Sequence, residues 1–399
     1  MMDDTQRKKP RRRRKNSSSS PMVFLPEELL AEILPFFDVK TILRLKCLSK
    51  SWFSFISDSN FIDKHLKNSS QNPHLTLFWY PALSCFNVVP FPVYRILKNP
   101  SIKNLYDSPK IPSIDHIKLV GSCNGLLCLL YYSRTAIEFS LWNPATRKIS
   151  KKLGLLPHGR NPDLGHFDFT FGYDATASTR DYKVVAFRAK DNEEEEGSWK
   201  SEVKVFSVGG GGGDNCWRNI QSFPVVPFNW FDTYYHRQRI TDGVHFSGTV
   251  NWLAVDNSIV SLYLSTETYK QFLMPPGFDD EVPLFKPVLR VLMDCLCFYH
   301  DSNKTEFVLW QMKQYGVRES WTQLFKISYQ NLQMHASFQL ACLYVNGDMA
   351  IFADESRKDR YQAFIYNLND KTVERIKCRN NIRWFEEAKD YVESLVSVC

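Results

Sequence analysis

Two histidine–carboxylate pairs are the side chains of this 399-residue sequence best suited to acid–base chemistry. His166 and Asp168 are two positions apart, and Asp242 precedes His245 by three. Positions i and i+2 of a strand point to the same face, so the first pair could form on a strand. No Gly-x-Ser-x-Gly motif or Cys–His signature accompanies either pair. The sequence therefore favours structural histidines, with His245 anchoring a turn or a channel wall, and predicts no catalytic residue.

Metal and phosphate binding also lack the residues they need. The ten cysteines include no Cys-x-x-Cys pair, and Cys295, Cys297 and His300 have no second ligand pair at a finger-like spacing. A run of five glycines, "VGGGGGD", lacks the Lys-Ser/Thr and the helix that complete a phosphate loop, so it is expected to be a loop tip. We expect no metal, no cofactor, and reduced thiols in an intracellular protein.

The positive charge is concentrated at the amino terminus. The chain carries +7, of which the first fifteen residues hold +6, from eight basic residues less Asp3 and Asp4. The remaining 384 residues are thus near +1, and we expect no nucleic-acid partner for them. Residues 1–22 are predicted to be a disordered tail. Its basic run is a candidate nuclear import signal or a nonspecific polyanion contact: Arg11, Arg12, Arg13, Arg14 and Lys15.

No secretory signal or membrane span is expected. The basic block is not followed by an apolar segment, and no apolar run approaches the roughly 20 residues that cross a bilayer. We therefore expect no membrane partner and a location in the nucleus, the cytoplasm or both.

Residues 25–58, "LPEELLAEILPFFDVKTILRLKCLSKSWFSFISD", are predicted to form short amphipathic helices. Pro26 suits a first helical turn, and Pro35 ends that element. Asp38 and Ser49 are placed to cap a second and a third helix. Trp52, Phe53 and Ile56 are expected to share one face. Fewer than about 50 residues seldom fold alone, so these apolar faces must pack on the rest of the chain or on a partner.

The same residues resemble an F-box. "LPEELLAEILPFF", "LRLKCLSKSWFSFIS" and "FIDKHL" agree with that motif in order, spacing and residue type, although Asp38 stands where plant members usually have proline. The resemblance implies an F-box over 23–68 that binds a Skp-family adaptor and, through it, a cullin and a RING subunit. The positions that match the family's pattern are Leu25, Pro26, Leu29, Ile33, Leu34, Leu43, Leu45, Cys47, Lys50, Trp52 and Ile56. Some of them, Trp52 and Ile56 especially, could instead hold the motif's own core.

From residue 73 onward the pattern changes to repeated short strands. Five units place an aromatic residue at a similar point, and the steps between them are 64, 57, 47 and 56 residues: Trp142, Phe206, Tyr263, Trp310 and Tyr366. A sixth, degenerate unit begins near "HLTLFWYPALSCFNVVPF". Such units indicate an irregular six-bladed β-propeller, with the last blade completed from both chain ends and an irregular β-sandwich as the alternative. The fold class is thus α+β in two parts.

This region also resembles the F-box-associated domain of plant F-box proteins, which is kelch-like. The resemblance rests on "GSCNGLLCL", "LWNPATRK", "FTFGYDATASTRDYKVVAF", "DGVHFSGTVNWLA", "LWQMKQYGVRESWTQLFKI" and "YVESLVS". It implies that residues 73–399 are the substrate-receptor part of a ubiquitin ligase subunit that breaks no bond itself. A propeller enzyme with a helical leader, or an F-box scaffold that does not cause degradation, remain the alternatives.

The target-binding loop is predicted in "PVVPFNWFDTYYHRQR". Exposed aromatic residues and arginine dominate binding hot spots, although many of these rings could instead be core. The candidate target-binding residues are Phe228, Trp230, Phe231, Tyr234, Tyr235 and Arg237. The sequence does not identify the target itself.

Overall fold

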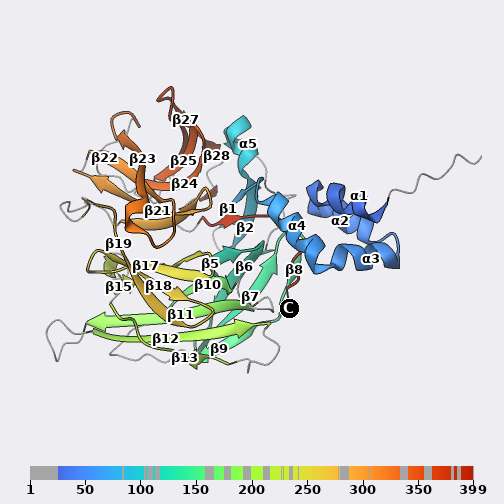
Figure 1. The fold of residues 1–399 in the computed structure, drawn as a ribbon, viewed down its shortest axis with the longest axis horizontal. Helices are drawn as coiled ribbons and strands as arrows, with labels where there is room; N and C mark the ends of the chain where they lie inside the picture. The colour runs from blue at the N-terminus through green and yellow to red at the C-terminus, as the bar shows by residue number, and fades with distance from the viewer. Residues whose placement is uncertain are drawn as a thin grey trace, which may run out of the picture.

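The fold is a group of short helices beside a ring of β-sheets, here in a computed structural model (Figure 1). Helices α1 to α3 project from one side of the β-body, and α4 leads to it. The structure describes residues 26–82, 85–102, 105, 111–112, 117–157, 166–174, 181–191, 199–209, 216–225, 227, 229–232, 237–240, 242–276, 278, 287–303, 305–332, 340–354, 362–378, 382–383 and 388–398. None of the helices in these ranges is long and apolar enough to cross a membrane.

The first three amino-terminal helices begin where the sequence predicts, and α4 is a further helix. The helices are α1 (Glu27–Ile33), the 3-10 helix η1 (Leu34–Phe36), α2 (Val39–Lys46), α3 (Lys50–Ser57) and α4 (Ser59–Ser69). Pro35 converts the end of the first helix into the 3-10 turn, because proline has no N–H to continue an α-helix.

Side-chain caps set the other helix starts. The Asp38 carboxylate accepts a hydrogen bond of 2.9 Å from the backbone N–H of Thr41, and Ser49 Oγ accepts one of 3.2 Å from that of Trp52. Both predicted caps are confirmed. Asp58 caps α4 in the same way, accepting from the N–H of Asn60 at 2.9 Å. Each cap satisfies an N–H that the helix itself leaves without a partner.

The described strands form six antiparallel sheets of four or five strands, the blades of a β-propeller, which confirms that fold over the sandwich. Blade 1 comprises β1 (His74–Ala82), β2 (Cys85–Pro92), β4 (Ile111–Pro112), β29 (Ile382–Arg383) and β30 (Asp390–Tyr391). Blade 2 comprises β5 (Ile117–Cys123), β6 (Leu126–Tyr132), β7 (Ala136–Asn143), β8 (Lys148–Ile149) and β9 (Leu153–Pro157). Blade 3 comprises β10 (Asp168–Asp174), β11 (Asp181–Asp191), β12 (Trp199–Val208) and β13 (Arg218–Asn219).

Blade 4 comprises β16 (Val244–Phe246), β17 (Thr249–Leu253), β18 (Ser258–Tyr263) and β19 (Thr268–Leu273); blade 5 comprises β20 (Val288–Leu292), β21 (Cys295–Ser302), β22 (Glu306–Met312) and β23 (Trp321–Ser328); blade 6 comprises β24 (Leu340–Asn346), β25 (Met349–Asp354), β26 (Gln362–Asn367) and β27 (Val373–Arg375). Outside the blades lie α5 (Val93–Lys98), η3 (Arg318–Ser320), the pair β3 (Ser101–Ile102) and β28 (Lys377–Cys378), and the hairpin β14 (Asn229–Asp232) and β15 (Arg237–Ile240).

The predicted repeat is confirmed strand by strand. The five aromatic residues taken as equivalent all lie on the third strand of a blade, on β7, β12, β18, β22 and β26. Their steps are uneven because strands, turns within blades and connections between blades all differ in length. The step of 64 residues contains the long strands β11 and β12 but only a ten-residue connection from β9 to β10, whereas the step of 57 contains the 24-residue connection from β13 to β16.

The ring closes through blade 1, which combines both ends of the β-rich chain. His74 and Leu75 on β1 pair with Tyr391 and Asp390 on β30. Thr76 strengthens this pairing, since its backbone N–H donates to Lys389 O at 3.0 Å and its Oγ1 accepts from Lys389 N at 2.7 Å. β30 thus serves as the first strand of blade 1 and lies next to β5, the first strand of blade 2. The predicted closure by both ends is confirmed.

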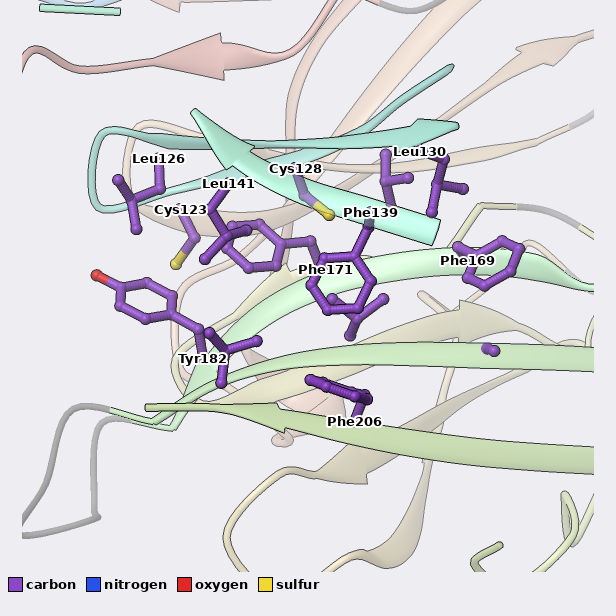
Figure 2. Packing of buried hydrophobic residues seen from close by; sticks show 14 of the residues in the cluster. Cys123, Leu126, Cys128, Leu130, Phe139, Leu141, Phe169, Phe171, Tyr182 and Phe206 are labelled. Atoms are coloured by element: carbon purple, nitrogen blue, oxygen red, sulfur yellow. The ribbon is translucent and has the colours of Figure 1, made fainter. Parts of the chain in front are cut away.

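The cores lie between adjacent blades. Figure 2 shows the layer where Phe139 from blade 2 meets Phe171 and Phe206 from blade 3. The rings of Phe139 and Phe206 pack edge to face with centroids 5.2 Å apart. Fully burying such a side chain contributes about 1.5–3 kcal/mol. Because a blade buries its faces only against its neighbours, each blade depends on the ring being complete.

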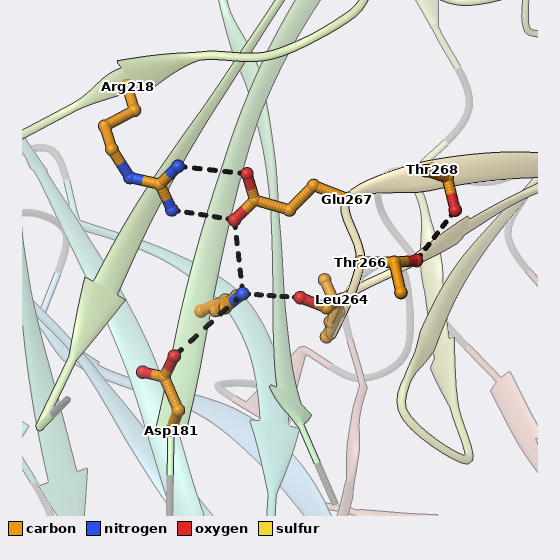
Figure 3. Close-up of polar contacts among 7 residues, drawn as sticks. Asp181, Arg218, Leu264, Thr266, Glu267 and Thr268 are labelled. Carbon is orange, nitrogen blue, oxygen red and sulfur yellow. Dashed lines mark hydrogen bonds and ion pairs between the residues drawn. The ribbon is translucent and has the colours of Figure 1, made fainter. Parts of the chain in front are cut away.

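A partly buried ion network joins blades 3 and 4 (Figure 3). Glu267 accepts two hydrogen bonds from the Arg218 guanidinium, at 2.7 and 3.0 Å, and one from Lys183 Nζ at 3.2 Å. Lys183 is buried and also donates to Leu264 O. Burial raises the pKa of Asp181, and Lys183 at 3.9 Å opposes that rise. Lys183 therefore compensates two carboxylates at a junction between blades.

We expect Lys183→Met to lower the free energy of unfolding by about 2 kcal/mol, because Asp181 and Glu267 each lose a cationic partner while Glu267 keeps its two bonds from Arg218. Urea unfolding followed by tryptophan fluorescence measures this change. Lys313→Met is the matched control, since Lys313 is exposed; it should change the stability by no more than about 0.5 kcal/mol. Equal effects of the two substitutions would show that the network contributes nothing.

Candidate functional site

Large apolar side chains are exposed on the amino-terminal helices far more often than elsewhere. Thirteen large hydrophobic residues are exposed in the described part of the chain, and six of them lie between residues 29 and 53. They are Leu29, Ile33, Phe36, Phe37, Leu48 and Phe53, with exposed fractions from 44% to 71%. Isolated exposed apolar residues are ordinary on a protein surface, but a group of this kind indicates a binding surface.

Four of the six lie close together in sequence, on α1, on η1 and at the residue that follows η1. Leu29 and Ile33 are at i and i+4 of α1 and so share one face of that helix, Phe36 ends η1, and Phe37 directly follows it. We call these four residues the α1 stripe. Leu48 and Phe53 lie apart from it in sequence, on either side of the start of α3, where Lys46 Nζ is 4.6 Å from the centroid of the Phe53 ring.

A small core holds these helices in place. Leu34, Ile42, Ile56 and Phe61 are at most 5% exposed and pack together. Half-buried residues surround them: Leu30, Leu45, Trp52, Phe55 and Leu395. The core uses one face of each helix and leaves the α1 stripe uncovered in this chain.

The structure separates the predicted adaptor-binding residues into three groups. Pro26, Leu29, Ile33, Cys47 and Lys50 are exposed; Leu43, Leu45 and Trp52 are half-buried; Leu34 and Ile56 are buried. Leu25 lies outside the described residues.

Leu34 and Ile56 lie in the core of the helices, which favours for both the alternative given above for Ile56, a role in the motif's own core. Contact of the remaining residues with an adaptor stays a prediction. The expected shared face of Trp52, Phe53 and Ile56 is also wrong, since Phe53 is 58% exposed and Ile56 is fully buried. Sequence reasoning missed Phe36, Phe37, Leu48 and Phe53. For Phe36 a signal was available, since it lies seven positions after Leu29.

The predicted target-binding loop falls partly on described backbone. Trp230, Phe231 and Arg237 lie on the β14–β15 hairpin, where Trp230 pairs with Arg239. Phe228, Tyr234 and Tyr235 lie outside the described residues, as does the basic run Arg11 to Lys15. These assignments stay predictions.

A cysteine–histidine pair sits where the first strands of blades 2, 3 and 4 meet. Cys123 Sγ is 3.6 Å from His245 Nδ1, and His245 Nε2 is 3.1 Å from both the N and the O of Tyr173. Burial raises the pKa of Cys123 to about 12, and burial lowers the pKa of His245. Both groups are therefore neutral at pH 7. A nucleophilic thiol requires the opposite shifts, so this pair is suited to joining strands.

Asp242, Cys297 and His300, which the sequence also offers for chemistry, have other partners in the structure. Asp242 lies 3.7 Å from both Lys118 and Lys389 rather than beside His245. Cys297 Sγ donates to Leu292 O, and His300 Nδ1 faces Asp301 O at 3.2 Å. Within the described ranges, no three histidine, cysteine or acidic residues form a group able to hold a metal ion.

Comparison with known proteins agrees with this architecture. Residues 24–64 match the F-box domain, and residues 87–398 match the F-box associated β-propeller domain. The chain is 28% identical over 329 residues to the F-box protein CPR1 of Arabidopsis thaliana. The aligned region covers 77% of this chain and 73% of that protein. It is 29% identical over 322 residues to the F-box/kelch-repeat protein At3g23880 of the same plant, covering 76% and 79%.

Among solved structures, TolB from Acinetobacter baumannii is similar with a TM-score of 0.45 and 7% identity, over 84% of this chain and 73% of TolB. That likeness is too distant to carry an argument. The helices and the ring together define a protein made of a small docking module and a propeller. The chain belongs to the plant F-box proteins with a carboxy-terminal F-box associated β-propeller domain.

We expect the thiols to differ strongly in reactivity. Cys47 and Cys216 are exposed, whereas Cys123, Cys128 and Cys342 are buried with raised pKa values. Iodoacetamide at pH 7.5, followed by peptide mass spectrometry, should therefore modify the exposed pair at least about tenfold faster than the buried thiols. Labelling of Cys123 as fast as Cys47 would contradict the structural role of the Cys123–His245 pair.

Proposed function

We propose that this chain is the substrate-recognition subunit of an SCF-type ubiquitin ligase. F-box proteins generally are receptors of this kind, and an F-box in general implies binding to a Skp-family adaptor. The observation that carries the proposal is the α1 stripe, because four large apolar side chains exposed so close together indicate a surface that a partner covers. The adaptor would cover this stripe and connect the chain to a cullin and a RING subunit.

The chain would act by proximity rather than by chemistry. Holding a target near a conjugating enzyme raises the effective concentration of the target's lysines. The alternative of a propeller enzyme has no support from the Cys123–His245 pair, whose neutral, buried groups suit a structural bridge.

The two ends of the propeller differ in the length of their links. In antiparallel blades, the links from a fourth strand to the next first strand lie at one end, and the links from first to second strand lie at the other. The former span ten to 24 residues between β9 and β24, whereas the latter span two to six. α4 leads into the start of β1, a second strand, so the F-box is attached at the end with short turns.

We propose that the target binds at the end with long links, away from the F-box. The β14–β15 hairpin belongs to the longest of these links, which supports the predicted target-binding loop. We retain the basic run Arg11 to Lys15 as a proposed nuclear import signal, with action in the nucleus, the cytoplasm or both.

The double substitution Leu29→Asp/Ile33→Asp should weaken binding to a Skp-family adaptor at least about a hundredfold, since burying two unpaired carboxylates in an apolar contact is costly. Biolayer interferometry with the purified full chain measures this loss. Leu155→Asp is the control, because Leu155 is 63% exposed on the propeller. The proposal fails if the folded wild type does not bind, or if both variants bind as the wild type does.

A further inference from the structure

The last eight described residues cross from the propeller to the F-box. β30 ends at Tyr391, and the chain then continues to Val398 without regular secondary structure. We call residues 391–398 the C-terminal strap. It leaves β30 at the end of the propeller with short turns, where the F-box is attached.

On the propeller side, the strap is held by buried polar groups. Asn143, which is fully buried at the end of β7, donates through Nδ2 to Ser394 O at 3.1 Å and to Val396 O at 2.8 Å. The Tyr391 hydroxyl accepts from the backbone N–H of Ala145 at 3.2 Å. Val396 adds its side chain to the core between blades 2 and 3. These contacts fix the strap to blade 2.

A glycine makes room for the strap. Gly125, in the β5–β6 turn, has a φ of +77°, and a Cβ at this position would lie 2.2 Å from Ser394 Oγ and 2.8 Å from Val392 O. Any other residue would therefore displace the strap as well as strain the turn. The seat for the strap is thus built into a turn of the propeller.

On the F-box side, the strap contributes to the helical core. Leu395 packs against the cluster of Leu34, Ile42, Ile56 and Phe61. Two residues earlier, Glu393 lies beside the start of α2: burial raises the pKa of its carboxyl, and so does Asp38, whereas the backbone of Val39, in the first turn of α2, lowers it. Its Oε1 also lies 4.0 Å from Nε2 of His74, the first residue of β1. The strap thus contacts α2 and the F-box core at the same time as blade 2.

Successive side chains of the strap serve two different cores. Leu395 faces the F-box, whereas its neighbours Ser394 and Val396 are buried against the propeller. α4 supplies a second contact, since Ile62 packs against the core between blades 2 and 3. Without the strap, that helix and the chain from Ser70 to Pro73 would be the main connection.

We propose that the C-terminal strap is a positioning element that fixes the F-box on the propeller, with Leu395 as its F-box anchor and Asn143 as its propeller anchor. This rests on the proposed function, in which the orientation of the F-box sets where a bound target lies relative to the ligase machinery. A ligase with a loose joint would hold its target's lysines within reach for a smaller fraction of the time.

The test compares Leu395→Ala with Ser397→Ala in the full chain. Ser397 is exposed in the same strap, so it controls for changes in the segment itself. Hydrogen exchange followed by mass spectrometry reports on peptides from α2 to α4 and from β5 to β7. We expect the helical peptides of Leu395→Ala to exchange roughly tenfold faster while the strand peptides keep the wild-type rate. Small-angle scattering should show a larger maximum dimension for this variant only.

The inference is overturned if the helices of folded Leu395→Ala exchange at the wild-type rate. It is also overturned if the strand peptides accelerate as much as the helical ones, because the strap would then serve only the closure of the propeller. Adaptor binding by the wild type is measured in parallel. If the wild type binds the adaptor but the helices of Leu395→Ala exchange at the wild-type rate, only the role of the strap is refuted. If those helices exchange faster but the wild type does not bind the adaptor, the ligase role is refuted and the role of the strap stands.

Discussion

Closure of the propeller ring is the constraint on which the rest of this structure depends. Blades of four short strands bury their apolar faces only against each other, so an open ring would leave two faces in water. Here the amino-terminal β1 and the carboxy-terminal β30 share one sheet. The chain therefore cannot complete its core until β30 is in place, and the residues that follow β30 start at the end of the propeller where the F-box is attached.

The position of the F-box follows from that closure. Because β1 is the second strand of blade 1, the helices that precede it are attached at the end of the propeller with short turns. The residues that follow β30 emerge at the same end and meet the helices. The result leaves the long links at the opposite end and the α1 stripe uncovered, an arrangement suited to a protein that connects two partners.

Much of this organisation could be predicted from the sequence because it depends on local rules. Asp38 and Ser49 cap the helices as expected, and the aromatic repeat marks the third strand of five blades. It was harder to predict which side chains of the F-box helices are buried, since helical spacing alone does not say which face of a helix another element covers. Ile56 and Phe53 lie three positions apart, yet one is core and the other is exposed. The pairing of Leu395 with the helical core joins residues over 330 positions apart, which no local pattern reveals.

The central claim is that the exposed apolar surface of the F-box binds an adaptor. Isothermal titration calorimetry of the full chain with a purified Skp-family adaptor, repeated at three temperatures, tests it most directly. We predict saturable one-to-one binding with a negative heat-capacity change, because apolar surface leaves water. Absence of binding by the folded chain, or binding with no change in heat capacity, would contradict the account.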